Sequence, residues 1–368
     1  MAMLIVVPRE TVPGERRVAL VPDAAGRLVK QGCTVRVEAG AGEPAGFGDD
    51  AYRGASAQVS DAASLYGEPG LILKVHPPTP DEAGRFAPGS TLISLLMPSR
   101  DTAAVAALAA RRVTALSMTL VPRISRAQSM DALSSQATVA GYKAVLLGTS
   151  AMSRFMPMLV TAAGTLPPAT AFVLGAGVAG LQAIATAKRL GANVRAFDVR
   201  PEVKEQIESL GAVFVAQEAI VRDATAAGGY ARASTSGELQ TQAQAIAKHV
   251  SESDLVITTA NVPGKRAPVL ITADMVRGMK SGSVIVDLAA ESGGNCELTR
   301  PGEDVVAHGV TILAPLNLPA QMPAHASQMY ARNLLAVLAL LIKDGALVMN
   351  RDDEVIKAML VPGTEGAA

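Results

Sequence analysis

Three glycines, Gly175, Gly177 and Gly180, stand at the spacing Gly-X-Gly-X-X-Gly. They follow a short apolar run at 171–174 and open an alanine-rich stretch that extends to about residue 190. A glycine turn between a strand and a helix brings backbone amides and the positive end of the helix close to a phosphate. The spacing alone is weak evidence in a chain with 33 glycines. Its place between a strand and a helix makes it typical of dinucleotide binding.

An acidic residue, Asp198, ends the next expected strand, 23 residues after Gly175. A carboxylate there would accept hydrogen bonds from the adenosine ribose hydroxyls and would repel a 2′-phosphate, which predicts NAD(H) as the cofactor. Arg200 leaves an alternative open, because a nearby arginine can serve NADP(H). The other interpretation of Arg200 is a surface arginine that precedes a helix starting at Pro201.

A second polar segment runs from Pro122 to Gln136 and is rich in serine, with arginines at 123 and 126. It carries no catalytic signature of its own. By composition alone it is typical of a polar linker between domains.

The composition indicates a globular protein that binds a small molecule. Lys+Arg and Asp+Glu number 33 each, and 49% of residues are hydrophobic, which excludes a disordered chain and argues against nucleic-acid binding. Cys33 and Cys296 occur in unrelated contexts, so we expect no disulfide framework. We also expect no metal site, because no His/Cys/Asp cluster has ligand spacing. A reducing, cytoplasmic setting fits this composition.

Neither a secretion signal nor a membrane span is expected. The apolar start at 3–7 leads into Pro8-Arg9-Glu10 without a basic leader, so it indicates a buried strand. The apolar run 334–342 is far shorter than the ~20 residues that a spanning helix needs.

Strand-like and helix-like segments alternate almost from end to end, which is typical of parallel sheets with crossover helices. The expected strands lie at 4–7, 34–38, 71–75, 91–95, 113–117, 171–174, 193–197, 213–215, 255–258, 284–287 and 310–313, and the main expected helices at 23–31, 101–111, 137–147 and 327–342. A loop is expected at 121–135. This order predicts an α/β fold with two doubly wound parallel-sheet, Rossmann-like domains.

The first domain is expected at 1–135, completed by about 320–368 at the C-terminal end, and the nucleotide-binding domain at 136–319. The connection 216–238 is long for a strand-to-helix loop and contains Gly228, Gly229 and Tyr230. Loops of this length are usually functional or mobile.

The whole chain resembles the NAD(H)-binding component, domain I of the alpha subunit, of the proton-translocating NAD(P) transhydrogenases. The resemblance extends from Pro8-Arg9-Glu10 near the start to Asn333-Leu334-Leu335 near the end. Its most specific stretches are 122–136, 177–191, 228–231 and 263–271.

This resemblance implies a doubly wound, two-domain subunit of an NAD(P)+ transhydrogenase of the Si-specific type. It implies a homodimer that docks on a membrane-anchored NADP(H)-binding transhydrogenase subunit. NAD(H) would bind this chain and NADP(H) the partner. The chain would be cytoplasmic and peripheral on the inner face of the cell membrane, through its partner subunits.

In that family the polar interdomain loop lies over the nicotinamide. Arg123, Asp131 and Ser134 match the residues that orient the cofactor's carboxamide end, Gln128 matches the one that reaches toward the opposing nucleotide, and the Tyr230 loop matches a mobile flap. The expected catalytic residues are therefore Gln128, Arg123 and Asp131. The expected cofactor contacts are Arg123, Gln128, Asp131, Ser134, Gly175, Gly177, Val178, Ala179, Gly180, Asp198, Val199, Arg200, Gly229, Tyr230, Thr259, Ala260 and Pro263.

The alanine dehydrogenases, a sister family with the same architecture, give an alternative. Such an enzyme must polarise a carbonyl and move a proton beside its substrate. Lys74 matches that family's lysine, but its histidine position is Leu96 and its aspartate is Glu291 here. Arg17 and Lys74 then are either remnants of a substrate pocket or structural ion pairs.

A third alternative is an NAD(H)-binding module without catalysis. The histidines are no stronger guide, because each is expected to be solvated or to cap a helix; they are His76, His249, His308 and His325. Hydride transfer between two nicotinamides needs no general acid or base, only geometry and exclusion of water. A site with orienting polar residues and no acid–base pair fits that chemistry best.

Overall fold

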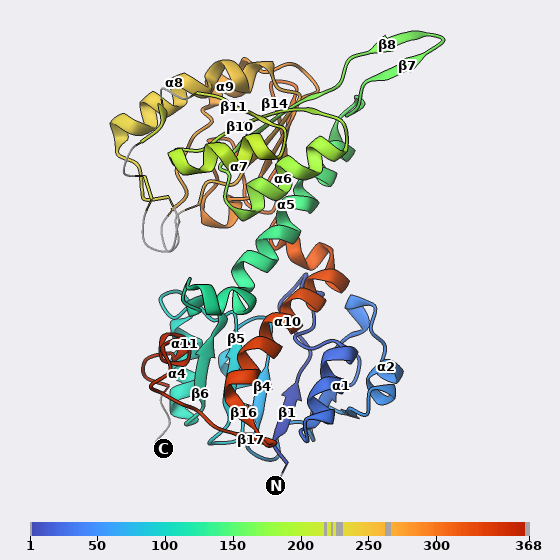
Figure 1. Cartoon of the computed structure of the whole chain (residues 1–368), viewed down its shortest axis with the longest axis vertical. Helices are drawn as coiled ribbons and strands as arrows, with labels where there is room; N and C mark the ends of the chain where they lie inside the picture. The colour runs from blue at the N-terminus through green and yellow to red at the C-terminus, as the bar shows by residue number, and fades with distance from the viewer. Residues whose placement is uncertain (1, 217–218, 222–223, 226–230, 262–265, 365–368) are drawn as a thin grey trace. The chain divides into compact units, whose positions relative to one another are not determined.

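The structure, a computed structural model, describes residues 2–216, 219–221, 224–225, 231–261 and 266–364 (Figure 1). The chain divides into two compact units. Unit 1 comprises Met1–Gln136 and Pro319–Ala368, and unit 2 comprises Ala137–Leu318.

Unit 1 is built on a six-stranded sheet in the order β3-β2-β1-β4-β5-β6, with every neighbouring pair parallel. The strands are β1 Leu4–Val7, β2 Thr34–Glu38, β3 Gln58–Ser60, β4 Leu71–Leu73, β5 Thr91–Ser94 and β6 Thr114–Ser117. The helices are α1 Pro22–Lys30, α2 Asp49–Gly54, α3 Pro80–Arg85, α4 Thr102–Ala110, α10 Pro323–Leu341 and α11 Glu354–Met359, and a small hairpin pairs β16 Ile342–Lys343 with β17 Ala346–Leu347.

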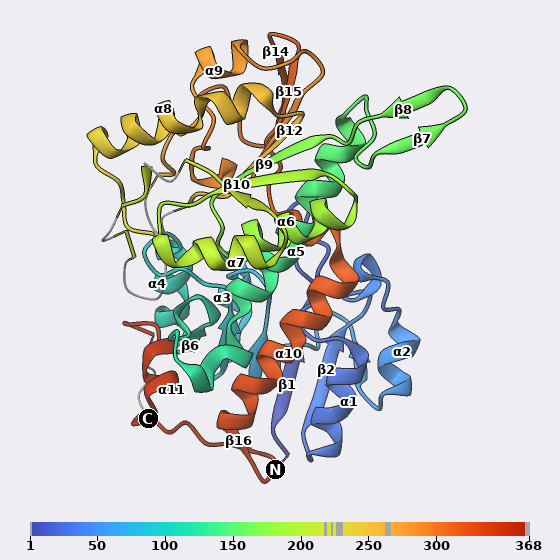
Figure 2. The ribbon, with the colours of Figure 1, turned by 45° about the horizontal axis from the view of Figure 1, so that its top comes forward.

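The late helix α10 lies across the sheet of unit 1, as both views show (Figures 1 and 2). Its buried side chains Tyr330, Leu334 and Leu338 share one apolar cluster with Ile5 and Val7 of β1. Helix α10, late in the sequence, therefore completes the core that the first strand begins.

Unit 2 is built on a seven-stranded sheet in the order β11-β10-β9-β12-β13-β15-β14. Only the β14–β15 pair is antiparallel among these strands. The strands are β9 Thr170–Leu174, β10 Asn193–Phe197, β11 Val213–Phe214, β12 Leu255–Thr258, β13 Val284–Asp287, β14 Asp304–Ala307 and β15 Val310–Leu313. The helices are α6 Val178–Arg189, α7 Lys204–Ser209, α8 Ser236–Glu252 and α9 Ala273–Arg277.

Two further elements of the chain bear on function. Helix α5, Ala132–Ala151, starts in unit 1 and ends in unit 2. The hairpin of β7 Leu159–Thr161 and β8 Gly164–Leu166 projects from the body of unit 2 (Figures 1 and 2).

Both main sheets have the doubly wound order 3-2-1-4-5-6 when their parallel strands are counted within each unit, which confirms the predicted fold class. Every strand expected from the sequence is present, within two residues at each end. The expected loop at 121–135 is partly wrong. It contains the 3-10 helix η3 Ser125–Met130, and α5 already begins at Ala132, because the Asp131 side chain accepts a hydrogen bond from the Ser134 amide at 2.9 Å and so caps the first turn.

Candidate functional site

The glycine turn of unit 2 lies between β9 and α6. Gly175 has a φ of +90°, and a Cβ there would lie 2.7 Å from Thr259 Oγ1. A Cβ at Gly180 would lie 1.9 Å from the carbonyl oxygen of Gly175. Neither position can hold a side chain, because Thr259 obstructs the first and the backbone of the turn obstructs the second.

The middle glycine of the turn, Gly177, has a different environment. It is the N-cap of α6, offers no side-chain cap, and a Cβ built on it would meet nothing within 4 Å. The first amides of a helix have no partners inside the helix, so this open end is suited to an anion. Val178 and Ala179 form the first turn of α6, and Val178 is 38% exposed.

The carboxylate of Asp198 lies directly beside the turn. Its Oδ2 accepts a hydrogen bond from the Ala176 amide at 2.7 Å, so it is coupled to the glycine loop. Its Oδ1 accepts from the Arg200 amide at 2.9 Å and from Arg200 Nε at 2.8 Å, and Arg200 Nη2 lies 2.8 Å from Oδ2. Asp198 is 5% exposed.

The interpretation of Arg200 as a surface arginine is wrong. Its side chain is only 12% exposed and makes a two-pronged ion pair with Asp198. Hydrogen bonding to that carboxylate raises the pKa of the guanidinium above its ordinary value, against the effect of burial. Val199, between them, accepts the Val221 amide on its carbonyl at 3.0 Å.

The loop after β12 faces the glycine turn at the point where the strand order of the sheet reverses, between β9 and β12. Thr259 Oγ1 donates to the Gly175 carbonyl at 2.9 Å. The Ala260 amide donates to Asn295 Oδ1 at 3.0 Å, and Asn295 Nδ2 donates to the carbonyls of Ala260 and Pro268, each at 2.8 Å.

Asn295 is itself held by Asp287 at the end of β13. The fully buried Asp287 carboxylate accepts from the amides of Asn295 and Cys296, from the Ala289 amide and from two hydroxyls, those of Thr258 and Thr299. Sequence reasoning missed both residues. The available signal was Asp287 at a strand end and, shortly after it, the run Gly293-Gly294-Asn295, whose glycines have φ of +101° and +84°.

Three expected cofactor contacts, Gly229, Tyr230 and Pro263, lie outside the residues that the structure describes. The turn, Asp198, Val199, Arg200, Thr259 and Ala260 are brought together at the carboxyl ends of β9, β10 and β12. In doubly wound folds this edge of the sheet binds the ligand.

The polar segment of unit 1 is an ordered structure rather than an extended linker. Asp131 Oδ2 accepts from Ser134 Oγ at 2.6 Å, so two of the expected nicotinamide residues are bonded to each other. Arg123 and Gln128 are exposed. All four residues lie within or directly beside η3 and the first turn of α5.

Two C-terminal helices hold this segment in place. Asn333 of α10 donates to the Ser129 carbonyl at 2.8 Å and accepts from Ser135 Oγ at 2.7 Å. Arg126 pairs with Asp353 and Glu354, at 3.0 and 2.9 Å, at the start of α11. The exposed Gln128 side chain is thus presented from an anchored backbone.

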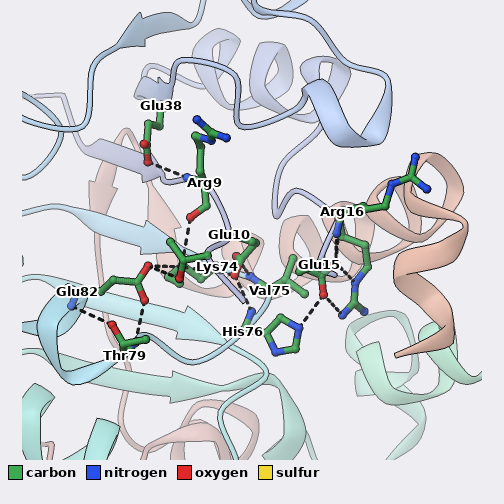
Figure 3. Close-up of polar contacts among 12 residues, drawn as sticks. Arg9, Glu10, Glu15, Arg16, Glu38, Lys74, Val75, His76, Thr79 and Glu82 are labelled. Carbon is green, nitrogen blue, oxygen red and sulfur yellow. Dashed lines mark hydrogen bonds and ion pairs between the residues drawn. The ribbon is translucent and has the colours of Figure 1, made fainter. Parts of the chain in front are cut away.

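A buried cluster of charges lies beside the ends of β1 and β4 in unit 1 (Figure 3). Lys74 is 1% exposed, and its Nζ lies 3.2 Å from Glu82 Oε1 and 3.4 Å from Glu10 Oε2. Burial acts against the charge of Glu82, but Lys74 and the Thr79 amide hold the pKa of its carboxyl below the ordinary value.

The neighbouring pair of the cluster is Arg17 and Glu15, joined by Nη2–Oε2 and Nε–Oε1 contacts of 2.6 and 2.9 Å. Arg17 Nη1 also donates to Gln136 Oε1 at 2.9 Å. His76 Nε2 lies 2.6 Å from Glu15 Oε2 and its side chain is 26% exposed, so the expectation that it is merely solvated or capping is wrong. The structural ion-pair interpretation of Arg17 and Lys74 describes these contacts.

Comparison with known proteins identifies the family of this chain. The family model "Alanine dehydrogenase/PNT, N-terminal domain" matches residues 6–140, and "Alanine dehydrogenase/PNT, C-terminal domain" matches residues 144–365. The chain belongs to the alanine dehydrogenase/PNT family.

Among the family members described next, the transhydrogenases are more similar to this chain than the alanine dehydrogenase is. It is 47% identical to the first part of NAD(P) transhydrogenase subunit alpha from Rhodospirillum rubrum, over 98% of this chain and 96% of that protein. The crystal structure of transhydrogenase from Sinorhizobium meliloti matches with a TM-score of 0.89 and 42% identity, covering 99% of this chain and 100% of that one. Alanine dehydrogenase 2 of Staphylococcus aureus (strain USA300) is 31% identical over 87% of this chain and 82% of that protein. The resemblance drawn from the sequence is confirmed.

The structure describes the two positions at which the sequence is expected to depart from the alanine dehydrogenase pattern. Leu96, at the histidine position, is fully buried, and its carbonyl accepts hydrogen bonds from the hydroxyls of Ser117 and Thr119. Glu291, at the aspartate position, is exposed, and its Oε1 accepts from the Asn317 amide at 2.9 Å.

Neither a metal centre nor a membrane span is found in the part of the chain that the structure describes. Among these residues, no group of three or more His, Cys, Asp or Glu side chains is arranged to hold a metal ion. No helix within the same ranges is both long and apolar enough to cross a membrane.

Proposed function

We propose that this chain is the NAD(H)-binding catalytic subunit of a proton-translocating NAD(P) transhydrogenase. The observation that carries the proposal is the coupling of the glycine turn to Asp198 through the 2.7 Å hydrogen bond from the Ala176 amide. This contact holds a carboxylate, of the kind that binds a ribose in dinucleotide sites, beside a helix end suited to a pyrophosphate. The names of the transhydrogenase relatives support the same function.

The residues of unit 2 fit a dinucleotide. The open space at Gly177 allows the pyrophosphate to approach the backbone, and the uncapped end of α6 supplies amides. Asp198 would bind the adenosine ribose, with Val199 and Arg200 beside it, and Thr259 and Ala260 would line the side of β12. Gly229, Tyr230 and Pro263 remain expected contacts.

The polar segment of unit 1 would act on the nicotinamide end. NADH, when bound, supplies the hydride. Arg123, Asp131 and Ser134 would orient the carboxamide, and Gln128 would reach toward NADP(H) on the partner subunit. Because hydride transfer between nicotinamides moves no proton on oxygen or nitrogen, these residues need only position and exclude water. Leu96, in place of a proton-relaying histidine, is compatible with this chemistry.

A homodimer is supported by the projecting hairpin of unit 2. Its strands and approach carry exposed apolar side chains, with Phe155 at 58%, Met158 at 59%, Val160 at 74% and Leu166 at 48% exposure. An apolar surface of this kind marks an interaction site, and a second copy of the chain is the proposed occupant. The membrane-anchored NADP(H)-binding subunit would place the chain in the cytoplasm, on the inner face of the cell membrane.

Nucleotide binding is tested by NADH titration of the wild-type chain and of Gly177→Ala. Gly177 has a φ of −72° and room for a Cβ, so alanine fits the fold and obstructs only the approach of a ligand. Gly48→Ala is the matched control, because Gly48 is the N-cap of α2 with a φ of −70° and nothing within 4 Å of its Cβ position. Weaker NADH binding in Gly177→Ala alone is expected, and equal binding in all three proteins would contradict the site.

Catalysis is tested by reconstitution with the purified NADP(H)-binding subunit. Reduction of an NADP+ analogue by NADH, dependent on both components, is the expected result. Stereospecifically deuterated NADH reports the face used, for which the expectation is Si. Binding of NADH without transfer would leave a non-catalytic NAD(H)-binding module, and turnover of alanine with NAD+ would indicate an amino-acid dehydrogenase.

A further inference from the structure

The carboxylate of Asp198 has no acceptor position left for a ribose. A carboxylate offers about four lone-pair directions on its two oxygens. Four hydrogen bonds reach Asp198, from the amides of Ala176 and Arg200 and from Nε and Nη2 of the Arg200 side chain. A ribose that binds Asp198 must therefore displace one of these donors.

The side chain of Arg200 is the donor that can leave. The two backbone amides belong to the glycine turn and to the chain after β10, and their movement would rearrange the fold of the turn. The guanidinium stands on rotatable bonds and remains 12% exposed, so rotation carries it to solvent without moving the backbone. Its two N–H groups meet the two oxygens of Asp198 side by side at 2.8 Å, as the two hydroxyls of a ribose would.

We propose that Arg200 is a specificity-determining residue that occupies the ribose-binding face of Asp198 in the free chain and is displaced when NAD(H) binds. This inference rests on the proposed function. The ion pair sets a cost on nucleotide binding, because one charged partner of Asp198 is exchanged for two neutral hydroxyls. After displacement, the positive charge of Arg200 stays near the ribose and weakens the repulsion that Asp198 exerts on a 2′-phosphate.

Two consequences separate this role from a direct contact between Arg200 and the nucleotide. Removal of the guanidinium frees Asp198, so Arg200→Gln binds NADH about three- to tenfold more tightly than the wild type. It also leaves the charge of Asp198 unopposed, so the preference for NADH over NADPH widens. Arg200→Lys keeps the charge and loses the two-pronged geometry, and its affinity lies between the two.

The experiment is titration of the full chain with NADH and NADPH, beside thermal unfolding with and without NADH. Arg195→Gln is the matched control, because Arg195 lies on β10 and its ion pair is away from the glycine turn. This variant loses a 2.6 Å ion pair with Glu252. In Arg200→Gln the free chain should melt lower than the wild type, and saturating NADH should restore most of the difference. A merely structural role would lower both melting temperatures alike and leave the affinity unchanged, which would overturn the inference.

A direct observation on the wild type keeps the test independent of how the variants fold. The Nε–H signal of Arg200 in nitrogen-15 NMR, assigned by its loss in Arg200→Lys, should be protected from exchange in the free chain and lose that protection on NADH addition. Weaker NADH binding in both variants, or an Nε–H signal that ignores NADH, would overturn the inference while the proposed function stands. A wild-type chain that binds no NADH would overturn both.

Discussion

Asn295 holds Ala260 from both sides, accepting its amide at 3.0 Å and donating to its carbonyl at 2.8 Å across 35 residues of sequence. Ala260 follows Thr259, whose hydroxyl donates to Gly175 in the glycine turn. The side chain of the fully buried Asn295 therefore fixes one wall of the proposed nucleotide site by bonding the backbone of Ala260.

Replacement of Asn295 should weaken NADH binding by more than the accompanying loss of folding stability accounts for. Asn295→Ala leaves the polar groups of Ala260 and Pro268 without their partner and should cost about 1–3 kcal/mol of stability. The shifted loop should weaken NADH roughly tenfold, because small displacements of positioning groups are costly. Thr299→Val is the control, since it removes one hydrogen bond to Asp287 without contact to Ala260. Calorimetric titration and denaturant unfolding are the measurements, and equal NADH affinity in both variants would contradict the positioning role.

Asp198 should set nucleotide choice. Asp198→Ala removes the ribose acceptor and the repulsion of a 2′-phosphate, so NADH binding should weaken while the NADH/NADPH preference narrows. Titration calorimetry with both nucleotides measures this. Glu252→Ala, which removes the partner of Arg195, should change neither affinity. An unchanged preference in Asp198→Ala would remove Asp198 from the site.

Gln128 tests the mechanism most sharply. Its side chain is exposed on η3, so Gln128→Asn should not affect folding. If the side chain acts on the second nucleotide, NADH affinity should stay nearly intact while single-turnover hydride transfer slows in the reconstituted complex. Stopped-flow transfer and equilibrium NADH titration on one preparation distinguish the two effects, with the exposed Ser125→Ala as control. A proportionate loss in both would place Gln128 on the NADH side only.

Oxidative deamination of alanine should be undetectable with saturating NAD+. The position expected for the proton-relaying histidine holds Leu96, which is fully buried and whose carbonyl accepts hydrogen bonds from the hydroxyls of Ser117 and Thr119. Leu96→His alone should not create an efficient enzyme, because Glu291 also departs from the alanine dehydrogenase pattern. Robust release of ammonia from alanine by the wild type would contradict the transhydrogenase assignment.

The Lys74–Glu82 pair should make the stability of unit 1 depend on pH. The folded pKa of Glu82 is lowered, so the pair stabilises the native state above the ordinary pKa of a glutamate, and this contribution disappears as the pH falls through the folded value. Glu82→Gln should cost about 1–3 kcal/mol at neutral pH, because Lys74 loses a buried partner. The gap to the wild type should close in acid. Denaturant unfolding from pH 7 to 3 measures this difference in unfolding free energy. Glu68→Gln is the control, and it should have little effect because the Glu68 side chain is 60% exposed. A difference that does not change with pH would contradict the stabilising role of the Lys74–Glu82 pair.

The sequence predicted the fold wherever apolar runs are buried on both faces. Strands such as β1 and β12, in which every residue is buried, leave an unbroken apolar signal. Two edge strands, β3 Gln58–Ser60 and β14 Asp304–Ala307, were missed because their pattern is polar or half exposed. Among the described strands of the seven-stranded sheet, the antiparallel β14 is also the one departure from parallel pairing.

The candidate site was predictable only where a local motif marks it. The glycine turn and Asp198 follow from spacing, but the partnership of Asp287, Asn295 and Ala260 joins residues far apart in sequence that share no periodicity. The pairing of Arg200 with Asp198 was equally hidden. Both residues could be read from the sequence, but only the structure shows that the Arg200 guanidinium donates to the Asp198 carboxylate.

The return of residues 319–368 to unit 1 sets an order on synthesis. Unit 2 is continuous, so it can fold as soon as its last strand leaves the ribosome, whereas the sheet that begins with Leu4 lacks Tyr330 and Leu334 until α10 has been made. Even the edge strand β6 needs residues that follow α11, because the Ala115 amide donates to Thr364 Oγ1 at 3.0 Å and the Val361 amide donates to the Ala115 carbonyl at 2.9 Å. The strands of unit 1 that precede unit 2 thus reach their native surroundings only after α10 has been made, and during that interval their apolar faces are exposed to aggregation.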